Sequence, residues 1–107
     1  MKRYDIHFDY LSLVIKPKLS GVRVSDKAIV GMLEEYLDEQ AVEASYGMRG
    51  YTERFIFPAT QTMVLFGGET QRGTLNIVLS GAGCAVMGED KIRELGIYLD
   101  EKYILNV

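Results

Sequence analysis

The segment 75–88 constrains the fold of this chain more than any other, because strand-forming residues run directly into a glycine-rich stretch. Leu75 to Leu79 reads Leu-Asn-Ile-Val-Leu, which is typical of a buried β-strand. Ser80 to Cys84 follows at once and reads Ser-Gly-Ala-Gly-Cys, which predicts a tight turn where residues without a Cβ let the backbone approach a neighbour. Such a turn can hold a phosphate or can be a sharp exit from a sheet, and the pattern alone allows both.

The length and the composition fit one domain over residues 1–107. Of the 107 residues, 48% are hydrophobic, which is enough to build a core without disulfides or metals. No stretch approaches the roughly 18 consecutive apolar residues of a membrane span, and the first residues lack the apolar core of a secretory signal. We therefore expect a single cytoplasmic domain that makes no contact with a membrane.

Hydrophobic periodicity predicts the order β-α-β-β-β-α. The predicted strands cover 8–15, 51–57, 62–66 and 74–79, and the predicted helices cover 25 to about 40–44 and 90–102. The first strand is almost wholly apolar from Tyr10 to Ile15, which favours a central strand covered on both faces, although its pairing is not readable. The tail 103–107 either adds a short strand or docks on the core. This order predicts an α+β domain, a mostly antiparallel sheet of about four strands with two helices on one face.

The segment 28–48 is acidic. The net charge is -3, and between Ala28 and Met48 there are five acids and no base, namely Glu34, Glu35, Asp38, Glu39 and Glu43. We expect them on the polar face of the first helix. They are either a solvated face or a contact surface for arginines and lysines of a partner protein that normally hold phosphates.

The basic residues are dispersed. Six of them could contact phosphates if the fold gathers them, namely Lys16, Lys18, Arg23, Arg49, Arg54 and Arg72. A general nucleic-acid binder usually carries a basic net charge or a concentrated basic face, and the net charge here argues against one.

No constellation for catalysis, metal or cofactor stands out. His7 and Asp9 share a strand face, but a divalent-metal site needs three or four ligands and the chain has no second histidine. Gly81 and Gly83 match part of a dinucleotide-binding loop, but the residues that follow argue against the immediate helix start that this loop requires. The only cysteine, Cys84, has the surroundings of a small buried residue. We expect no cofactor, no metal and no enzymatic activity.

Several segments together resemble one family. They are Phe8-Asp9-Tyr10-Leu11-Ser12-Leu13, Gly47-Met48-Arg49-Gly50-Tyr51, Leu65-Phe66-Gly67-Gly68 and Ile77-Val78-Leu79-Ser80-Gly81-Ala82-Gly83-Cys84. In this order they resemble the N-terminal part of replication initiation factors, the initiators of rolling-circle plasmids and filamentous phages, with related relaxases. In that family the Thr-Arg-x-Asp strand, the metal-binding segment and the nucleophilic tyrosine come later. This chain ends at Val107 before such segments, so the resemblance carries over no catalytic residue.

The resemblance implies a domain from a mobile genetic element, and two hypotheses follow. In the first, the chain is a stand-alone relative without catalysis that binds a protein partner through the acidic residues. It would act as an inhibitor or regulator of an initiator or, like an anti-CRISPR protein, of a host defence nuclease. In the second, the chain is a DNA-binding module or a fragment of an initiator and uses the six basic residues. Either reading allows a monomer or a homodimer.

Overall fold

The computed structural model describes residues 10–18, 24–44, 47–68 and 73–106. The elements run in the order β1 (Tyr10–Lys16), α1 (Asp26–Leu37), β2 (Val42–Ala44), β3 (Glu53–Phe57), β4 (Thr62–Phe66), β5 (Leu75–Ser80), α2 (Gly81–Lys102) and β6 (Ile104–Asn106). No helix in these ranges is long and apolar enough to cross a membrane.

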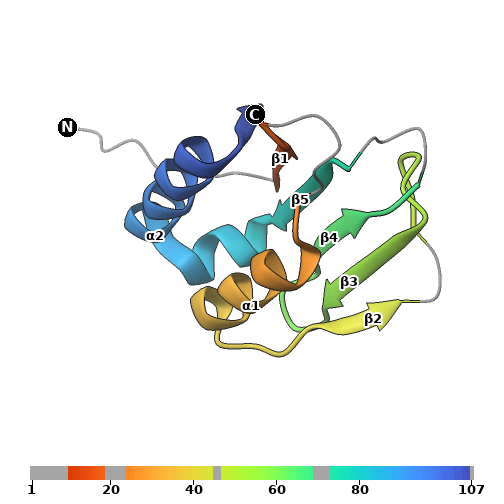
Figure 1. The fold of residues 1–107 in the computed structure, drawn as a ribbon. Coiled ribbons are helices and arrows are strands. Elements are labelled where there is room, and N and C mark those ends of the chain that lie inside the picture. The colour runs from red at the N-terminus through yellow and green to blue at the C-terminus, as the bar shows by residue number, and fades with distance from the viewer. Residues whose placement is uncertain (1–9, 19–23, 45–46, 69–72, 107) are drawn as a thin grey trace.

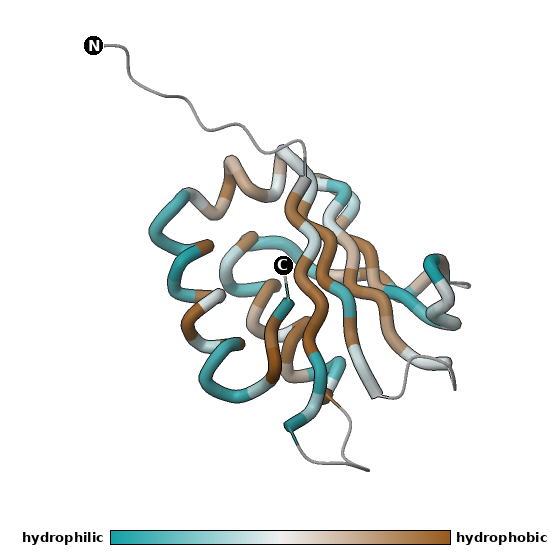
Figure 2. The backbone as a smooth tube through the Cα atoms, turned by 90° about the horizontal axis from the view of Figure 1, so that it is seen from above, coloured by the Kyte–Doolittle hydropathy of each residue, from teal (hydrophilic) through white to brown (hydrophobic). Residues whose placement is uncertain are grey.

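The strands form one sheet of six, in the order β2-β3-β4-β5-β1-β6, and every described pairing is antiparallel. Both helices lie on the same face of this sheet (Figure 1 and Figure 2). The predicted α+β class and antiparallel sheet are confirmed. The expected number of about four strands is too small, because β2 and β6 have 3 residues each and are too short to show an alternating pattern. β6 is the short strand that the tail could add.

The main core lies between the sheet and the helices. Ile15, Phe57 and Ile77 of the sheet are fully buried there, together with Leu33 of α1 and Leu99 of α2. β1 is internal in the sheet, between β5 and β6, but the helices cover only the face that carries Leu11, Leu13 and Ile15. The prediction that the first strand is covered on both faces is therefore wrong, since Val14 on the other face is only half-buried. Residues 8 and 9 of the predicted strand lie outside the described residues.

α1 begins where the sequence predicts. Ser25 is its N-cap, and the Ser25 hydroxyl accepts a hydrogen bond from the Ala28 amide at 3.3 Å. The helix ends at Leu37, earlier than expected, because Asp38 adopts a left-handed conformation with φ of 52° and donates its amide to the Glu34 carbonyl. The chain is then free to form β2 at Val42.

The glycine-rich segment after β5 is helical from Gly81, so the turn predicted over 80–84 is wrong. Ser80 is the N-cap of α2, and its hydroxyl accepts a hydrogen bond from the Gly83 amide at 2.9 Å. Gly88, with φ of 81° and ψ of 164°, is not helical and divides α2 into two helical segments. The second segment runs to Lys102, so the helix predicted over 90–102 is confirmed, and the first segment is an addition that the sequence did not predict. The predicted close approach is real at Gly83, where a Cβ would lie 2.4 Å from Thr62 Oγ1.

Candidate functional site

The face of the sheet away from α1 and α2 carries a set of side chains that the helices do not cover, and we call it the open face. Strand alternation and the pairing register place on it Ser12, Val14, Lys16, Val42, Ala44, Arg54, Ile56, Met63, Leu65, Asn76, Val78, Ile104 and Asn106. Lys16 and Arg54 are the charged members of this set. The same alternation turns Glu43 and Glu53 to the helix side, so the described strands bring bases but no acids to the open face.

The middle of the open face combines an apolar row with a polar pair. Val42, Ile56, Met63 and Val78 follow one another across four neighbouring strands. Beside this row, Asn76 is only 6% exposed and exchanges hydrogen bonds of 3.3 Å with Ser12. The pair meets diagonally across β1 and β5, because Ser12 stands opposite Val78 and Asn76 stands opposite Val14.

A turn over residues 48–51 lies against one end of the open face. The Met48 carbonyl accepts the Tyr51 amide at 3.0 Å, and Arg49 and Gly50 between them have φ of 56° and 87°, as in a type I′ turn. Gly47 is required before it, because a Cβ there would lie 2.3 Å from the Tyr51 carbonyl oxygen. The turn leaves Arg49 exposed. It also packs Tyr51 on Leu65 and Val78, with the Tyr51 hydroxyl 3.0 Å from Thr74 Oγ1.

Arg54 joins this turn to the sheet. Its Nη1 donates to the Met63 sulfur at 3.3 Å and reaches the Met48 sulfur at 3.7 Å. A thioether is a weak acceptor without charge, so these two contacts orient the guanidinium and add no negative charge to it. Arg49 and Arg54 are thereby brought to the same end of the open face.

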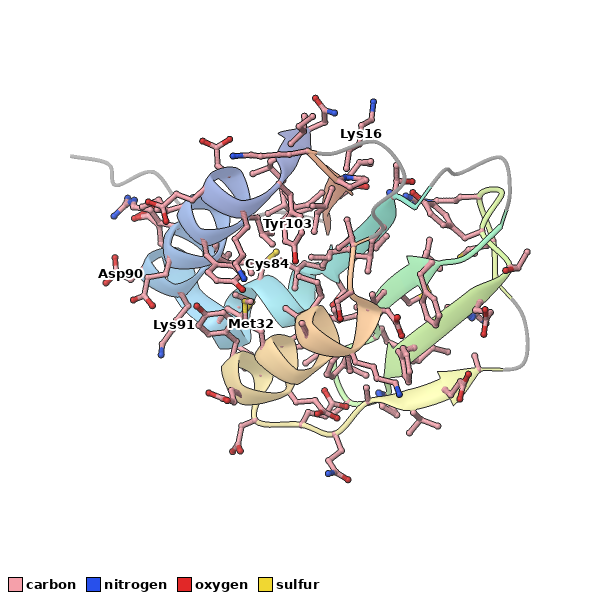
Figure 3. All side chains as sticks on the ribbon, viewed as in Figure 1. Lys16, Met32, Cys84, Asp90, Lys91 and Tyr103 are labelled. Atoms are coloured by element: carbon pink, nitrogen blue, oxygen red, sulfur yellow. The ribbon has the colours of Figure 1, made fainter. Side chains whose placement is uncertain are left out.

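Lys16 lies toward the other side of the same face and extends outward from the end of β1 (Figure 3). Three strand steps separate it from Arg54, since β4 and β5 lie between β3 and β1. This spacing amounts to about 14 Å across the sheet. The distance suits contacts with separate phosphates of one nucleic-acid ligand.

The other predicted bases do not join this surface. Lys18 is exposed, and its Nζ donates to the Glu101 backbone carbonyl at 2.7 Å, which ties the segment after β1 to the end of α2. Arg23 and Arg72 lie outside the described residues.

The predicted acidic residues do not form one helix face. The Glu34 carboxylate accepts the Ala41 amide at 3.0 Å, and the Glu39 carboxylate accepts the Ala59 amide at 2.5 Å and the Thr60 hydroxyl at 3.2 Å. Glu39 follows the end of α1, and Glu43 lies in β2 rather than on the helix. Glu35, Asp38 and Glu43 are exposed.

The described residues offer little for nucleophilic or metal chemistry. Cys84 is buried in the layer between α2 and the sheet (Figure 3), and burial raises the pKa of its thiol. Burial, followed by the charges of Glu94 and Glu35, raises the pKa of Tyr36. His7 and Asp9 lie outside the described residues. Within the part that the structure describes, no three side chains of histidine, cysteine, aspartate or glutamate gather as a metal site would require.

Comparison with known proteins gives one informative match. No family model and no curated protein matches the chain. Among solved structures, it is similar to the rolling circle replication initiator protein from Geobacillus stearothermophilus, with a TM-score of 0.63 and 19% sequence identity. The match covers 92% of this chain and 39% of that one, so the chain spans well under half the length of the initiator. At this identity the similarity shows the fold alone, and the shared fold corresponds to a part of that initiator.

Proposed function

We propose that this chain is a non-catalytic DNA-binding module on an initiator-like fold, and that the open face with the turn 48–51 is its contact surface. The observation that carries the proposal is that basic and acidic side chains lie on opposite faces of the sheet. Lys16 and Arg54 lie on the open face and Arg49 lies on the adjoining turn, while the acids of the described strands lie on the helix side. A cytoplasmic site of action in a cell that carries a mobile genetic element belongs to the proposal.

The surface suits a ligand that offers both phosphates and apolar groups. Arginine and lysine neutralise phosphates and release their counterions, which supplies affinity without sequence preference. The apolar row has no charge to place against a phosphate, but its members outside the buried cluster with Tyr51, namely Val42, Ile56 and Met63, can meet sugars and bases. The net charge of -3 opposes binding at a distance, so the local basic groups must carry the affinity.

The test is the salt dependence of DNA affinity. The double change Lys16→Glu with Arg49→Glu is compared with Lys91→Glu and Lys102→Glu on α2, which alter the net charge equally but lie on the helix side of the sheet. Single- and double-stranded oligonucleotides are titrated from about 50 to 200 mM salt. We expect the first variant to bind more weakly, with a salt slope smaller by about 0.7 to 0.9 for each phosphate that it no longer neutralises. An equal decrease of affinity in both variants, or no DNA binding by the parent protein, contradicts the proposal.

A protein partner is the second candidate, because Glu35, Asp38 and Glu43 are exposed near the end of α1 and the start of β2. In this reading the domain inhibits or regulates an initiator or a host defence nuclease through that acidic surface. The test changes these three residues to Lys and leaves Glu34 and Glu39 intact, because the latter two hold loops through hydrogen bonds. A partner captured from host lysate after nuclease treatment should be absent with the variant. Retained capture rules out the acidic surface.

A further inference from the structure

A small cleft lies on the helix side of the sheet, away from the open face. It has a volume of about 70 Å³ and lies where α1 and β3 begin and β4 ends. The side chains of Asp26, Glu53 and Phe66 contribute to its lining. Pockets for drug-sized ligands and cofactors measure about 300 to 1,000 Å³, so this cleft suits the head group of a single side chain.

Two carboxylates give the cleft a negative charge. Strand alternation places Glu53 on the helix side, and Asp26 lies in the first turn of α1, where the helix dipole favours negative charge. A Cβ on Gly67 would lie 3.1 Å from Glu53 Oε2, so this carboxylate lies close to the backbone at the end of β4. Among the residues that the structure describes, no lysine or arginine forms an ion pair with either carboxylate. The charge is therefore available to a cationic ligand.

An aromatic surface adjoins the carboxylates. Phe66 stacks on Phe55 with 5.4 Å between the ring centroids, and both side chains are half-buried. Glu53 stands opposite Phe66 in the β3–β4 pair, and Glu43 stands opposite Phe55 in the β2–β3 pair. Carboxylates and aromatic rings thus alternate over three neighbouring strands. A cation held by a carboxylate on this surface can also interact with a ring.

We propose that this cleft binds an arginine side chain of a partner protein, and that the surface around it docks the basic segment that carries this arginine. A planar guanidinium suits the lining, because it donates hydrogen bonds to carboxylates and stacks on aromatic rings, whereas a lysine ammonium is a compact and strongly hydrated point charge. The inference concerns the helix side of the sheet. It requires neither DNA binding by the open face nor capture of a partner through Glu35 and Asp38.

The same lining argues against a metal ion and against a phosphate. Calcium takes about six to eight oxygen ligands, whereas the cleft offers two carboxylates, and the Thr74 hydroxyl beside them lies 3.0 Å from the Tyr51 hydroxyl. A phosphate would be repelled by both carboxylates. A guanidinium uses the carboxylates and the Phe66 ring together, so it fits the whole lining.

The test is an NMR titration of the full chain with three peptides that differ at one position. The peptide Gly-Ser-X-Ser-Gly carries arginine, lysine or citrulline at X, and citrulline keeps the shape of arginine without its charge. The amide signals of Gly67 and Gly73, which line the cleft, report on binding. A double variant, Asp26→Asn with Glu53→Gln, removes both carboxylates. The matched control, Asp100→Asn with Glu101→Gln, changes the net charge equally at exposed positions of α2.

We expect the arginine peptide to bind at about millimolar concentration, with shifts concentrated at Gly67 and Gly73. Its affinity should fall about tenfold or more in the cleft variant, as for the loss of hydrogen bonds between charged groups, and should stay within about twofold in the control. The lysine peptide should bind more weakly, and the citrulline peptide should leave the signals unchanged. Equal binding of the arginine and citrulline peptides, or an equal loss in both variants, overturns the inference. Thermal unfolding of both variants checks that they remain folded.

Two other occupants are distinguished by the same titration. Saturation of the Gly67 and Gly73 signals by Ca²⁺ alone, with no response to the arginine peptide, would identify a metal site and overturn the inference. Binding of the peptide only after Arg23→Ala or Arg72→Ala would identify an arginine of this chain as the occupant, which also overturns it. Failure of the open face to bind DNA contradicts the proposed function and leaves these outcomes unchanged.

Discussion

The two faces of the sheet use the same strands in different ways. On the helix-covered face, the side chains of Ile15, Val64 and Ile77 are fully removed from solvent and pack on α1 and α2. On the open face, the neighbouring positions Val14 and Ile56 are half-buried, and Val42 is 55% exposed. Leu65 and Val78 of the open face are buried in the cluster with Tyr51. Only the part of the open face outside this cluster is therefore available to a ligand.

The polar groups differ between the faces as well. On the helix side they bind one another: Thr60 bridges Glu39 and Thr62, and the Ser80 hydroxyl donates to the Thr60 carbonyl while it caps α2. This network joins the end of α1, the β3–β4 turn and the start of α2. On the open face, Asn76 pairs with Ser12, and Lys16 extends outward from the sheet (Figure 3).

The largest difference is expected from one pair of isoleucines. Ile77→Ala removes a fully buried side chain from the helix-covered face and should lower the free energy of unfolding by about 2 to 5 kcal/mol. Ile56→Ala, at a half-buried position of the open face, should cost about 1 kcal/mol. Urea denaturation of both variants measures the difference. Equal destabilisation would show that a second surface covers the open face in solution.

The sequence predicts the covered face better than the open one. Pro17 and Pro58 follow the ends of β1 and β3, Ser25 caps α1, and the apolar stripe of α1 is buried as its spacing predicts. The buried residues of α1 include Ile29, Leu33 and Leu37, which recur at helical spacing in the sequence. These signals are local, so they are readable without the fold. The start of α2 is not readable in this way, because Cys84 and Met87 are buried against the sheet and burial of this kind depends on tertiary contacts.

The candidate surface is only partly readable for the same reason. The sequence indicates Lys16, Arg49 and Arg54 as possible phosphate contacts. They come to lie at the same face of the sheet through the pairing of β1 with β5, and the sequence does not show this pairing. The contact of Met48 with Arg54 depends on a turn with two positive φ values. Gly50 is the available sequence signal for that turn, and Arg49 gives none.

The next largest effect is expected at a glycine on the helix side. Gly83→Ala places a Cβ 2.4 Å from Thr62 Oγ1, which is buried and hydrogen-bonded to Thr60, so the neighbours must shift at a cost of about 1 to 3 kcal/mol. Gly96→Ala is the matched control, because no atom lies within 4 Å of the added Cβ and the position is helical. It should raise stability by about 0.5 to 1 kcal/mol. Thermal unfolding measures both changes. If Gly83→Ala unfolded at the same temperature as the parent protein, Gly83 of α2 would not be in close contact with Thr62 of β4.

A smaller effect is expected at Glu39. Its carboxylate accepts the Ala59 amide and the Thr60 hydroxyl, so Glu39→Ala should destabilise the protein by about 1 to 2 kcal/mol. Glu35→Ala, at an exposed position of the same acidic segment, should change stability by less than about 0.5 kcal/mol. Thermal unfolding of the two variants separates an internal contact from a solvated charge. Equal destabilisation by the two substitutions would mean that the Glu39 carboxylate is solvated and belongs to the acidic surface.

The smallest effect on stability is expected where the effect on binding is largest. Lys16→Glu reverses a charge at an exposed position of the open face, where no described carboxylate of the strands shares the surface. Its free energy of unfolding should therefore stay within about 0.5 kcal/mol of the parent value, while DNA affinity falls. Denaturation and DNA titration of the same preparation measure both quantities. A destabilisation as large as that of Glu39→Ala would show that Lys16 stabilises the fold. The open face could then not be described as a binding surface separate from the structural, helix-covered face.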